Sequence, residues 1–490
     1  MRKRVSCGVA MALAVLLALP AAAWAQGGGI GAVKGELDMT WVMVACVLVL
    51  FMQAGFLLLE IGFSRQKNVG AGVAKVLVNL GVVTLAWWAV GFGISSLTGN
   101  KIFGTEGFFF HNGQEIAGVP VGGTETALML FGMLFCAVSL AIVWGTTLER
   151  IKFGAYVVYA AVFGAIIYPL VAHGVYGGGV LADVAGKPVM DFAGSSVVHL
   201  TGAVGALAAL MLLGPRIGKY GADGKPRAIP GHSMAMVGLG VAILWVGWYG
   251  FNAGSTFGTS GNFMAQVALN TQLAAAAGVL GACAIVYLKT KSLDVGMAGN
   301  GAIAGLVGIT APSGFVEFWA APIIGLVAGV IVVYGVYAID KRLDDPVGAL
   351  SAHGLAGIWG TLAVGLFGSE RLILDGAAPG LWYGIFGDAE VAATAGQLGV
   401  QAVGVAATFA LVFTLSYATF WAIKKTIGLR VSEDEEHAGL DISSHGMYGL
   451  PEAFIPPEEY PGADERAPVP ASRPAAGTAT AMTADRPSQA

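Results

Sequence analysis

Long apolar runs, separated by short polar segments, recur along the chain from about residue 40 to residue 423. A helix that crosses the hydrocarbon core of a bilayer needs about 20 predominantly apolar residues. By this measure the pattern predicts eleven transmembrane helices, of which the eighth is short and the last is long. The expected spans are residues 40–62, 73–94, 126–144, 153–171, 197–213, 234–251, 263–288, 297–311, 319–339, 347–367 and 398–423. The pattern therefore predicts an all-α membrane protein with a transmembrane domain over residues 40–427.

The polar segments between these spans alternate in their content of Lys and Arg. With the N-terminus outside, fifteen of these basic residues fall on the inner side and four on the outer side. The inner ones are Arg65, Lys67, Arg150, Lys152, Arg216, Lys219, Lys225, Arg227, Lys289, Lys291, Lys341, Arg342, Lys424, Lys425 and Arg430, and the outer ones are Lys34, Lys101, Lys187 and Arg371. Because cytoplasmic loops collect positive residues, the alternation predicts an odd number of spans, a periplasmic N-terminus and a cytoplasmic C-terminus.

The two ends of the chain differ from the spans. Residues 1–25 begin with the basic stretch Arg2 to Arg4, continue with an apolar stretch and end in Ala-Trp-Ala, the pattern of a cleaved signal peptide. An uncleaved first helix is the alternative, although the apolar stretch is shorter than a span. We expect the mature chain to start at Gln26, with residues 26–39 in the periplasm. Residues 455–490 are rich in Pro and Ala and are expected to be disordered.

Composition excludes a soluble enzyme. The chain is 56% hydrophobic and 11% charged, about half the charge of an ordinary soluble domain. Charge this scarce cannot coat a globule of 490 residues, so most of the surface faces lipid. The 74 glycines suit close packing of transmembrane helices, and the net charge of −4 offers no basic surface for nucleic acid. The cysteines, Cys7, Cys46, Cys136 and Cys283, have no CxxC spacing, so we expect packing roles for them and no metal or other cofactor.

One internal repeat carries the candidate chemistry. The fifth span begins with DFAGSSVVH, Asp191 to His199, and the tenth with DPVGALSAH, Asp345 to His353. Five spans per repeat is an odd number, so the two copies are inverted relative to each other, followed by one long C-terminal helix. Eight residues of helix rise about 12 Å. The two histidines therefore enter from opposite sides and are expected to meet near the middle of the membrane.

A pair of histidines at that depth allows two interpretations. Each is either a separate hydrogen-bonded core residue or part of a pore, because ionisable residues at bilayer depth usually mark transport paths and proton relays. Neutral imidazoles both donate and accept hydrogen bonds, whereas a bare cation at this depth is costly. The pair therefore favours a small solute that sheds a proton and crosses as the neutral species.

Aromatic residues gather at the outer end of the sixth span, in the string GWYGFNAGS. Trp248 and Phe251 offer ring faces that attract cations, and the Ser255 hydroxyl can accept a hydrogen bond from an N–H donor. The alternative is that Trp248 only anchors the helix at the membrane boundary. Phe131 and Phe135, one helical turn apart in the third span, are by themselves ordinary packing residues.

Six strings together resemble the ammonium transporter family (Amt/Mep/Rh). They are ERIKF, DFAGSSVVH, GWYGFNAGS, GAIAGLVGIT, DDPVGALSAHGLAGIWG and GLRVSEDEEHAGLDISSHG, and the similarity covers residues 38–446. The resemblance implies a homotrimer with one pore in each subunit, in the inner membrane of a bacterium. It also implies that residues 428–454 form a cytoplasmic regulatory region, and that the cytoplasmic face binds a PII-type signalling protein.

The resemblance assigns the aromatic residues to two sites. Phe135, Trp248 and Ser255 would form an outer site that recruits ammonium by cation–π attraction and a hydrogen bond. Phe131, directly below Phe135 on the helix, would form a stacked aromatic gate with Phe251.

The resemblance further implies that His199 and His353 are the twin pore histidines and that Asp191 is an outer-mouth acid required for transport. For Asp191, a role as helix cap competes with direct proton transfer. Ammonium would lose its proton at or below the outer site, ammonia would cross the apolar pore, and the proton would follow a separate route.

Three positions depart from the family pattern or lie beside it. Tyr176 stands at the outer site where well-studied bacterial members carry Trp, and a phenol offers a poorer π-face. Glu60, near the inner end of the first span, is either a structural helix-end partner or a functional acid. Lys75 lies close to the predicted inner boundary and is expected to snorkel.

Four functions fit this set of residues to different degrees. The leading hypothesis is an ammonium transporter. An ammonium sensor that signals through its cytoplasmic tail and an electroneutral gas channel of the Rh type are the alternatives. A membrane enzyme that binds a metal through the histidine pair lacks the third and fourth ligands that such a site needs.

Overall fold

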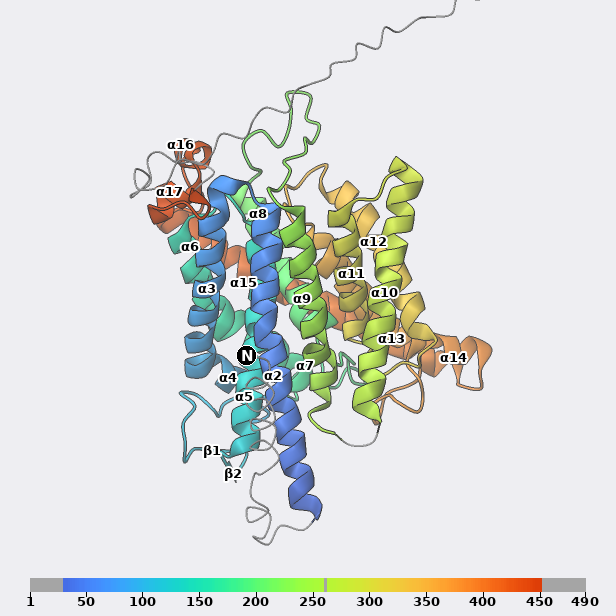
Figure 1. Ribbon diagram of the computed structural model, residues 1–490. Helices are drawn as coiled ribbons and strands as arrows, with labels where there is room; N and C mark the ends of the chain where they lie inside the picture. Colours follow the sequence, from blue (N-terminus) through green and yellow to red (C-terminus); the bar gives the residue numbers. More distant parts are fainter. Residues whose placement is uncertain (1–29, 260–261, 452–490) are drawn as a thin grey trace, which may run out of the picture. The chain divides into compact units, whose positions relative to one another are not determined.

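Helices of membrane-crossing length run side by side through the body of the protein (Figure 1). The computed structural model describes residues 30–259 and 262–451. Within these residues, ten helices or continuous helical runs are long and apolar enough to cross a bilayer. A shorter apolar helix, α11 (Val295–Thr310), stands in the place of the eighth predicted span. The prediction of a helical membrane protein is thereby confirmed.

Some predicted segments lie outside the described residues, namely the signal peptide (1–25), the first residues of the periplasmic N-terminus and the Pro/Ala-rich tail (455–490). From residue 30 onward the chain is already helical, because α2 extends from Ile30 to Phe63. The first helix thus begins ten residues before the predicted span.

The first half of the chain forms five helical runs. They are α2; η2 (Gln66–Asn68) with α3 (Val69–Ala86), the π-helical turn η3 (Trp87–Gly91) and α4 (Phe92–Ser95); α5 (Gly123–Thr146); α6 (Phe153–Val162) with η4 (Phe163–Ile167) and α7 (Tyr168–Tyr176); and η5 (Ser195–Leu200) with α8 (Thr201–Leu213). Between α4 and α5 the chain forms a short antiparallel hairpin of β1 (Glu115–Ile116) and β2 (Val119–Pro120).

The second half repeats this arrangement of five runs. They are α9 (Met234–Asn252) with η6 (Ala253–Thr256); α10 (Phe263–Thr290); α11; α12 (Ala320–Ile339); and η7 (Leu350–Leu355) with α13 (Ala356–Phe367). The short helix α14 (Leu381–Phe386) and the long helix α15 (Val391–Thr426) follow, and then α16 (Glu433–Ala438) and α17 (Leu440–His445). In the predicted topology, the end of the bundle with β1 and β2 is the outer end and the end with α16 and α17 is the inner end (Figure 1).

The last runs of the two halves lie side by side and point in opposite directions. At the start of η5, the Ser196 hydroxyl shares a hydrogen bond of 2.6 Å with the hydroxyl of Thr361, which lies well along α13. Just after α8 ends, Arg216 pairs with Asp344, which lies before η7 begins, at 2.9 Å. The beginning of each run therefore meets the later part of the other, as the inverted repeat predicts.

Small residues allow the helices of the second half to pack closely. A Cβ atom on Gly325 of α12 would collide with the carbonyl oxygen of Ala274 on α10, and one on Gly329 would collide with that of Gly278. These glycines form a GxxxG pair, a spacing that favours direct backbone contact between membrane helices. This pair is therefore a helix-packing face between α12 and α10.

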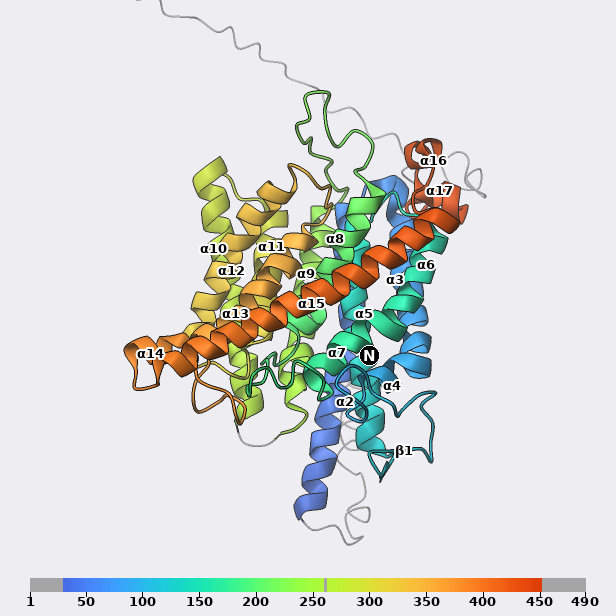
Figure 2. The same cartoon turned by 180° about the vertical axis from the view of Figure 1, so that it is seen from behind.

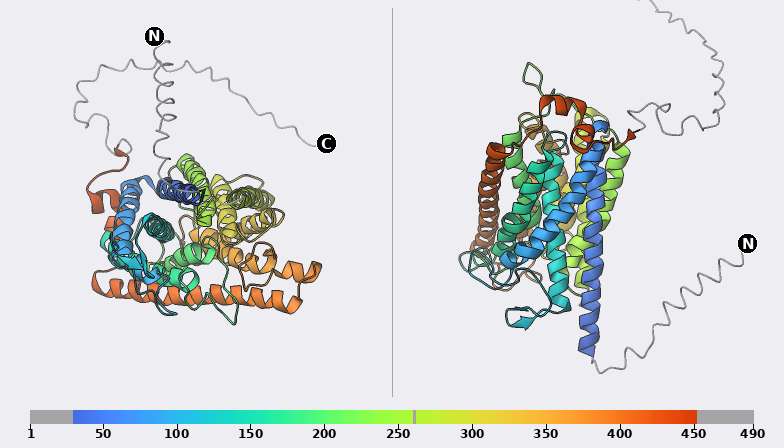
Figure 3. Two further views of the ribbon diagram at one scale, coloured as in Figure 1. Left: turned by 90° about the horizontal axis from the view of Figure 1, so that it is seen from below. Right: turned by 90° about the vertical axis from the view of Figure 1, so that its left-hand side faces the viewer.

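Helix α15 crosses the back of the bundle obliquely (Figure 2) and lies along one side of it when seen from below (Figure 3). Its 36 residues span about 54 Å, much more than the hydrocarbon thickness of about 30 Å, so the tilt accommodates its length. Gln401 fixes its outer part, because its side chain accepts a hydrogen bond from the Met190 N–H and donates one to the Met190 carbonyl, at 2.8 and 2.7 Å.

The segment after α15 folds back onto the inner end of α3. Lys67 Nζ donates to the carbonyl oxygens of Glu436 and His437 at 2.8 and 2.6 Å. The Asp441 carboxylate accepts from the Ala71 N–H at 2.9 Å. Charged groups therefore hold α16 and α17 against the bundle in this subunit.

Candidate functional site

Two histidine rings face each other in the interior of the bundle. The Nδ1 atoms of His199 and His353 lie 3.3 Å apart, and their ring planes make an angle of 25°. Both side chains are buried. Nε2 of His199 has no hydrogen-bond partner among the described residues. The structure thus brings together the two histidines that the sequence repeat singled out.

Each histidine lies in a π-helical turn, η5 or η7, that begins after an aspartate and a glycine. The Asp191 carboxylate accepts four backbone N–H groups at 2.8 to 3.0 Å, those of Gly194, Ser195, Ser196 and Val197. The Asp345 carboxylate accepts those of Val347, Gly348 and Leu350 at 2.7 to 3.4 Å.

These carboxylates satisfy N–H groups that have no partner within the helix. Gly194 and Gly348 make this possible, because their φ angles of +115° and +76° lie in the left-handed region that suits glycine. Asp191 and Asp345 therefore set the direction of the turns that carry His199 and His353. The structure agrees with the interpretation of Asp191 as a helix cap.

A stack of phenylalanine rings lies on the outer side of the histidines. Phe135 stacks on Phe251 with ring centroids 3.9 Å apart and an angle of 7° between the planes. Phe131 is tilted against Phe135 at 4.3 Å. Helix α5 begins at the outer end, so Phe131 lies outside Phe135 and not below it. The prediction that Phe131 lies below Phe135 and stacks on Phe251 was wrong. The ring parallel to Phe251 is that of Phe135.

Trp248 lies on the opposite side of Phe251, at the level of the histidines. Its indole stacks on His199 with centroids 5.1 Å apart, and its Nε1 donates to the Thr310 hydroxyl at 3.0 Å. The side chain is completely buried, so it is not an anchor at the membrane boundary. Ser255 lies seven residues further along, about two helical turns away. The predicted grouping of Trp248 with Ser255 in one outer site therefore does not match the structure.

Three other residues lie toward the outer end of the bundle, and two of them contact this stack. Ser255 is half-buried, and its hydroxyl donates to the Phe251 carbonyl oxygen at 2.9 Å. Tyr176 ends α7 with 41% of its surface exposed. Phe257, which no sequence motif singles out, packs edge-on against Phe131 with centroids 5.2 Å apart.

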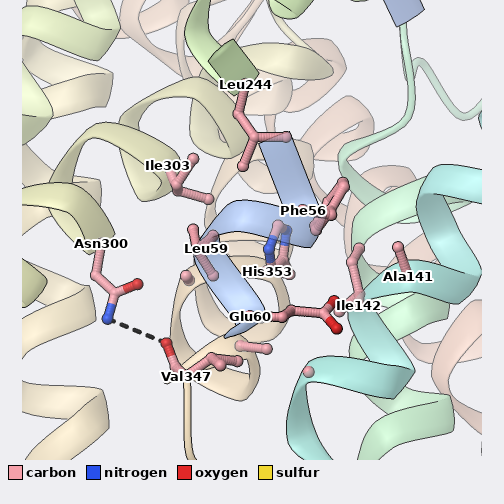
Figure 4. A pocket seen from close by; sticks show the side chains of 13 residues that line it. Phe56, Leu59, Glu60, Ala141, Ile142, Leu244, Asn300, Ile303, Val347 and His353 are labelled. Atoms are coloured by element: carbon pink, nitrogen blue, oxygen red, sulfur yellow. Dashed lines mark hydrogen bonds between the residues drawn. The ribbon is translucent and has the colours of Figure 1, made fainter. Parts of the chain in front are cut away.

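On the inner side of His353 there is a cavity of about 20 Å³, enough for one water-sized molecule (Figure 4). Its wall is mostly apolar and includes Phe56 and Ile303. Glu60 also lines it and is 1% exposed. Lys75 on α3 is 2% exposed, so the expectation that it snorkels to the surface was wrong.

A buried network of charges closes the inner end of the two halves. Arg216 makes a bidentate pair with Asp344, with both N–O distances at 2.9 Å, and lies 3.8 Å from Glu149. Burial opposes the negative charge of Asp344, but the hydrogen bonds from Arg216 and the charge of Arg150 lower its pKa from 3.8 to about 2. Burial likewise opposes the charge of Glu149, but Arg216 and Arg65 outweigh it and lower the Glu149 pKa. The network joins the end of α8 to the segment that carries Asp345.

These features define a class of protein. Two inverted halves hold paired ionisable side chains at their common centre, and buried aromatic rings separate that centre from the outer end. This is the construction of a membrane transporter or channel.

Comparisons with known proteins specify the class. A sequence model of the Ammonium Transporter Family matches residues 40–450. Ammonium transporter Amt2 of Archaeoglobus fulgidus is 43% identical over 468 residues, which cover 92% of this chain and 97% of the relative. An ammonium transporter of Bacillus subtilis is 33% identical, with 84% and 97% covered. A solved structure described as Sensor Amt Protein is similar with a TM-score of 0.77 and 32% identity, covering 85% of this chain and all of the other. The chain belongs to the ammonium transporter family and is a multi-pass membrane protein.

Proposed function

We propose that the protein transports ammonium across the bacterial inner membrane by separating it into ammonia and a proton. The observation that carries the proposal is the pair of buried, facing histidines directly behind the stacked rings of Phe135 and Phe251. The stretch between these rings and the histidines offers hydrogen bonds to a small neutral molecule and no side-chain charge to balance a permanent cation. A cation that cannot shed a proton is therefore excluded by the cost of desolvation.

Recruitment would take place at the outer end of the stack. Phe131, Phe135, Tyr176 and Ser255 supply the ring faces and the hydroxyl oxygen that attract an ammonium ion. Trp248 belongs to the inner part of the path, where its ring covers His199. Ammonium would lose its proton on the outer side of Phe251, and ammonia would then pass the histidines.

The proton would follow a separate route through the hydrogen-bonded imidazoles. A neutral imidazole has one donor and one acceptor nitrogen, so two rings in contact can relay a proton by exchanging these roles. Asp191 would support this by holding the His199 turn in place. Transport on this scheme carries net charge.

The assembly and the partners also follow the family pattern. We infer a homotrimer with one pore in each subunit, a periplasmic N-terminus and a cytoplasmic C-terminus. The inner end, where α16 and α17 lie, would present the surface for a PII-type signalling protein.

Currents from proteoliposomes on a solid-supported membrane test the transport proposal. An ammonium jump should give a current in the unaltered protein, and Asp191→Asn should lower it at least tenfold, because an amide cannot accept all four N–H groups. Asp183→Asn is the matched control, since Asp183 is an exposed aspartate that also bonds a backbone N–H. Absence of current in intact, folded protein would refute electrogenic transport.

A sensor is the second candidate. Two observations favour it, namely the similarity to a solved structure described as Sensor Amt Protein and the close attachment of α16 and α17 to α3. A sensor should bind ammonium without sustained current and change the protease accessibility of residues 433–445 on binding. An electroneutral gas channel should equilibrate ammonia across the bilayer with no current.

A further inference from the structure

The Glu60 carboxylate stands apart from the other buried acids of the protein. Asp191, Glu149 and Asp344 all bind backbone N–H groups or arginine side chains. Both oxygens of Glu60 lack a hydrogen-bond partner among the described residues, although the side chain is 1% exposed. A buried carboxylate without partners is costly, so its presence calls for a physical reason.

The position of Glu60 connects it to the pore. It lines the same cavity as His353, on the inner side of that histidine (Figure 4). The cavity holds about 20 Å³, which is room for a single water or ammonia molecule. Asn300 lines another part of the wall, but its amide donates to the Val347 carbonyl oxygen at 3.2 Å. Glu60 is therefore the acidic group that a molecule leaving His353 meets in this cavity.

Charged and titratable groups approach Glu60 from the neighbouring helices. Lys75 on α3 is buried and acts on Glu60 through its charge, and Tyr156 on α6 lies close enough to be affected by the carboxylate. His353 on η7 shares the cavity. Tyr156 itself donates to the Lys75 carbonyl oxygen. A positive Lys75 favours the negative form of Glu60 and so offsets part of the cost of releasing its proton.

We propose that Glu60 is the inner proton station of the pore, where ammonia regains the proton that it lost at the outer end. This inference rests on the proposed transport function. In the step, the protonated Glu60 carboxyl transfers its proton to the nitrogen of an ammonia molecule in the cavity, which gives a carboxylate and an ammonium ion. The ammonium leaves to the inner side, and the next proton arriving past the histidines reprotonates Glu60.

Glu60→Gln tests this assignment, because Gln keeps the shape of the side chain but cannot transfer a proton. Glu36→Gln is the matched control, since Glu36 lies on the same helix with an exposed side chain. Two signals are recorded after an inward ammonium jump, the current on a solid-supported membrane and the pH inside liposomes loaded with a pH-sensitive dye. Protein-free liposomes supply the background of ammonia leakage.

The proposal predicts that Glu60→Gln lowers the current at least tenfold and makes the liposome interior alkaline faster than the unaltered protein does. The interior becomes alkaline because ammonia arrives without its proton and takes one from the lumen. Glu60→Asp, which retains a carboxyl group, should restore at least part of the current.

Two results would overturn the proposal. One is an unchanged current in Glu60→Gln, as expected if the carboxylate only fills space. The other is the loss of both signals, which would mean that the substitution blocks the ammonia path itself. Failure of the transport proposal is separate, because the unaltered protein would then give no current at all.

Discussion

Replacing Asp344 by asparagine removes a buried negative charge at the junction of the two halves. Asp344 accepts two hydrogen bonds from the Arg216 side chain at 2.9 Å and one from its backbone N–H at 2.8 Å. Arg216 is 4% exposed, so its charge has little access to solvent. The substitution Asp344→Asn keeps the size of the side chain and loses the charge.

The expected loss of stability follows from the pKa of Asp344. A pKa lowered from 3.8 to about 2 corresponds to about 2.4 kcal/mol of stabilisation at neutral pH, at about 1.36 kcal/mol per pH unit. Leaving a buried charge without its partner costs about 3–5 kcal/mol in general. Glu149 remains 3.8 Å from Arg216 and offsets part of this. We therefore expect Asp344→Asn to lower the free energy of unfolding by about 2–4 kcal/mol at pH 7.

Unfolding of the detergent-solubilised protein by a graded denaturing detergent, followed by tryptophan fluorescence, measures this difference. Asp223→Asn is the control, because Asp223 pairs with Lys225 at 3.9 Å and both side chains are exposed, by 59% and 82%. An exposed pair contributes only about 0–1 kcal/mol.

The pH dependence gives an independent check. Because folding lowers the Asp344 pKa, its stabilisation is present above the unfolded-state value of 3.8 and is lost as pH falls toward 2. The difference between the unaltered protein and Asp344→Asn should therefore shrink as the pH falls from about 5 to about 2. A penalty equal to that of Asp223→Asn, or one that does not change with pH, would refute the reasoning.

Three further predictions concern the pore and the packing. His199→Ala combined with His353→Ala should raise potassium currents at least tenfold, and unchanged ion selectivity would refute the neutral pathway. Tyr176→Trp should lower the half-saturating ammonium concentration about two- to fivefold, because a better π-face adds about 0.5–1 kcal/mol; an unchanged value would remove Tyr176 from recruitment. Gly329→Ala should cost about 1–3 kcal/mol of stability by overpacking against α10, whereas Gly399→Ala, which meets open space, should cost far less in the same unfolding assay.

Local patterns in the chain were sufficient to predict the architecture and the central pair of histidines. The length of an apolar run determines whether it can cross a bilayer, so ten of the eleven predicted spans correspond to membrane-length helices and the eighth to the short helix α11. The Asp-x-x-Gly and His spacing likewise depends on one helical turn and its cap, so the repeat identified Asp191, Asp345, His199 and His353 without any tertiary information.

Contacts between distant residues decided the rest. The placement of whole helices against each other decides which ring stacks on Phe251, how deep Trp248 lies in the bundle and whether Lys75 is buried. The sequence of one helix cannot determine this placement. Arg216 and Asp344 are 128 positions apart, and Glu60 and His353 come from different halves of the chain. Interactions between residues that are close in sequence can be predicted from the sequence. A cavity, however, exists only where several helices together leave space unfilled. The sequence left Glu60 as either a helix-end partner or a functional acid, and only the cavity that it shares with His353 favours the second role.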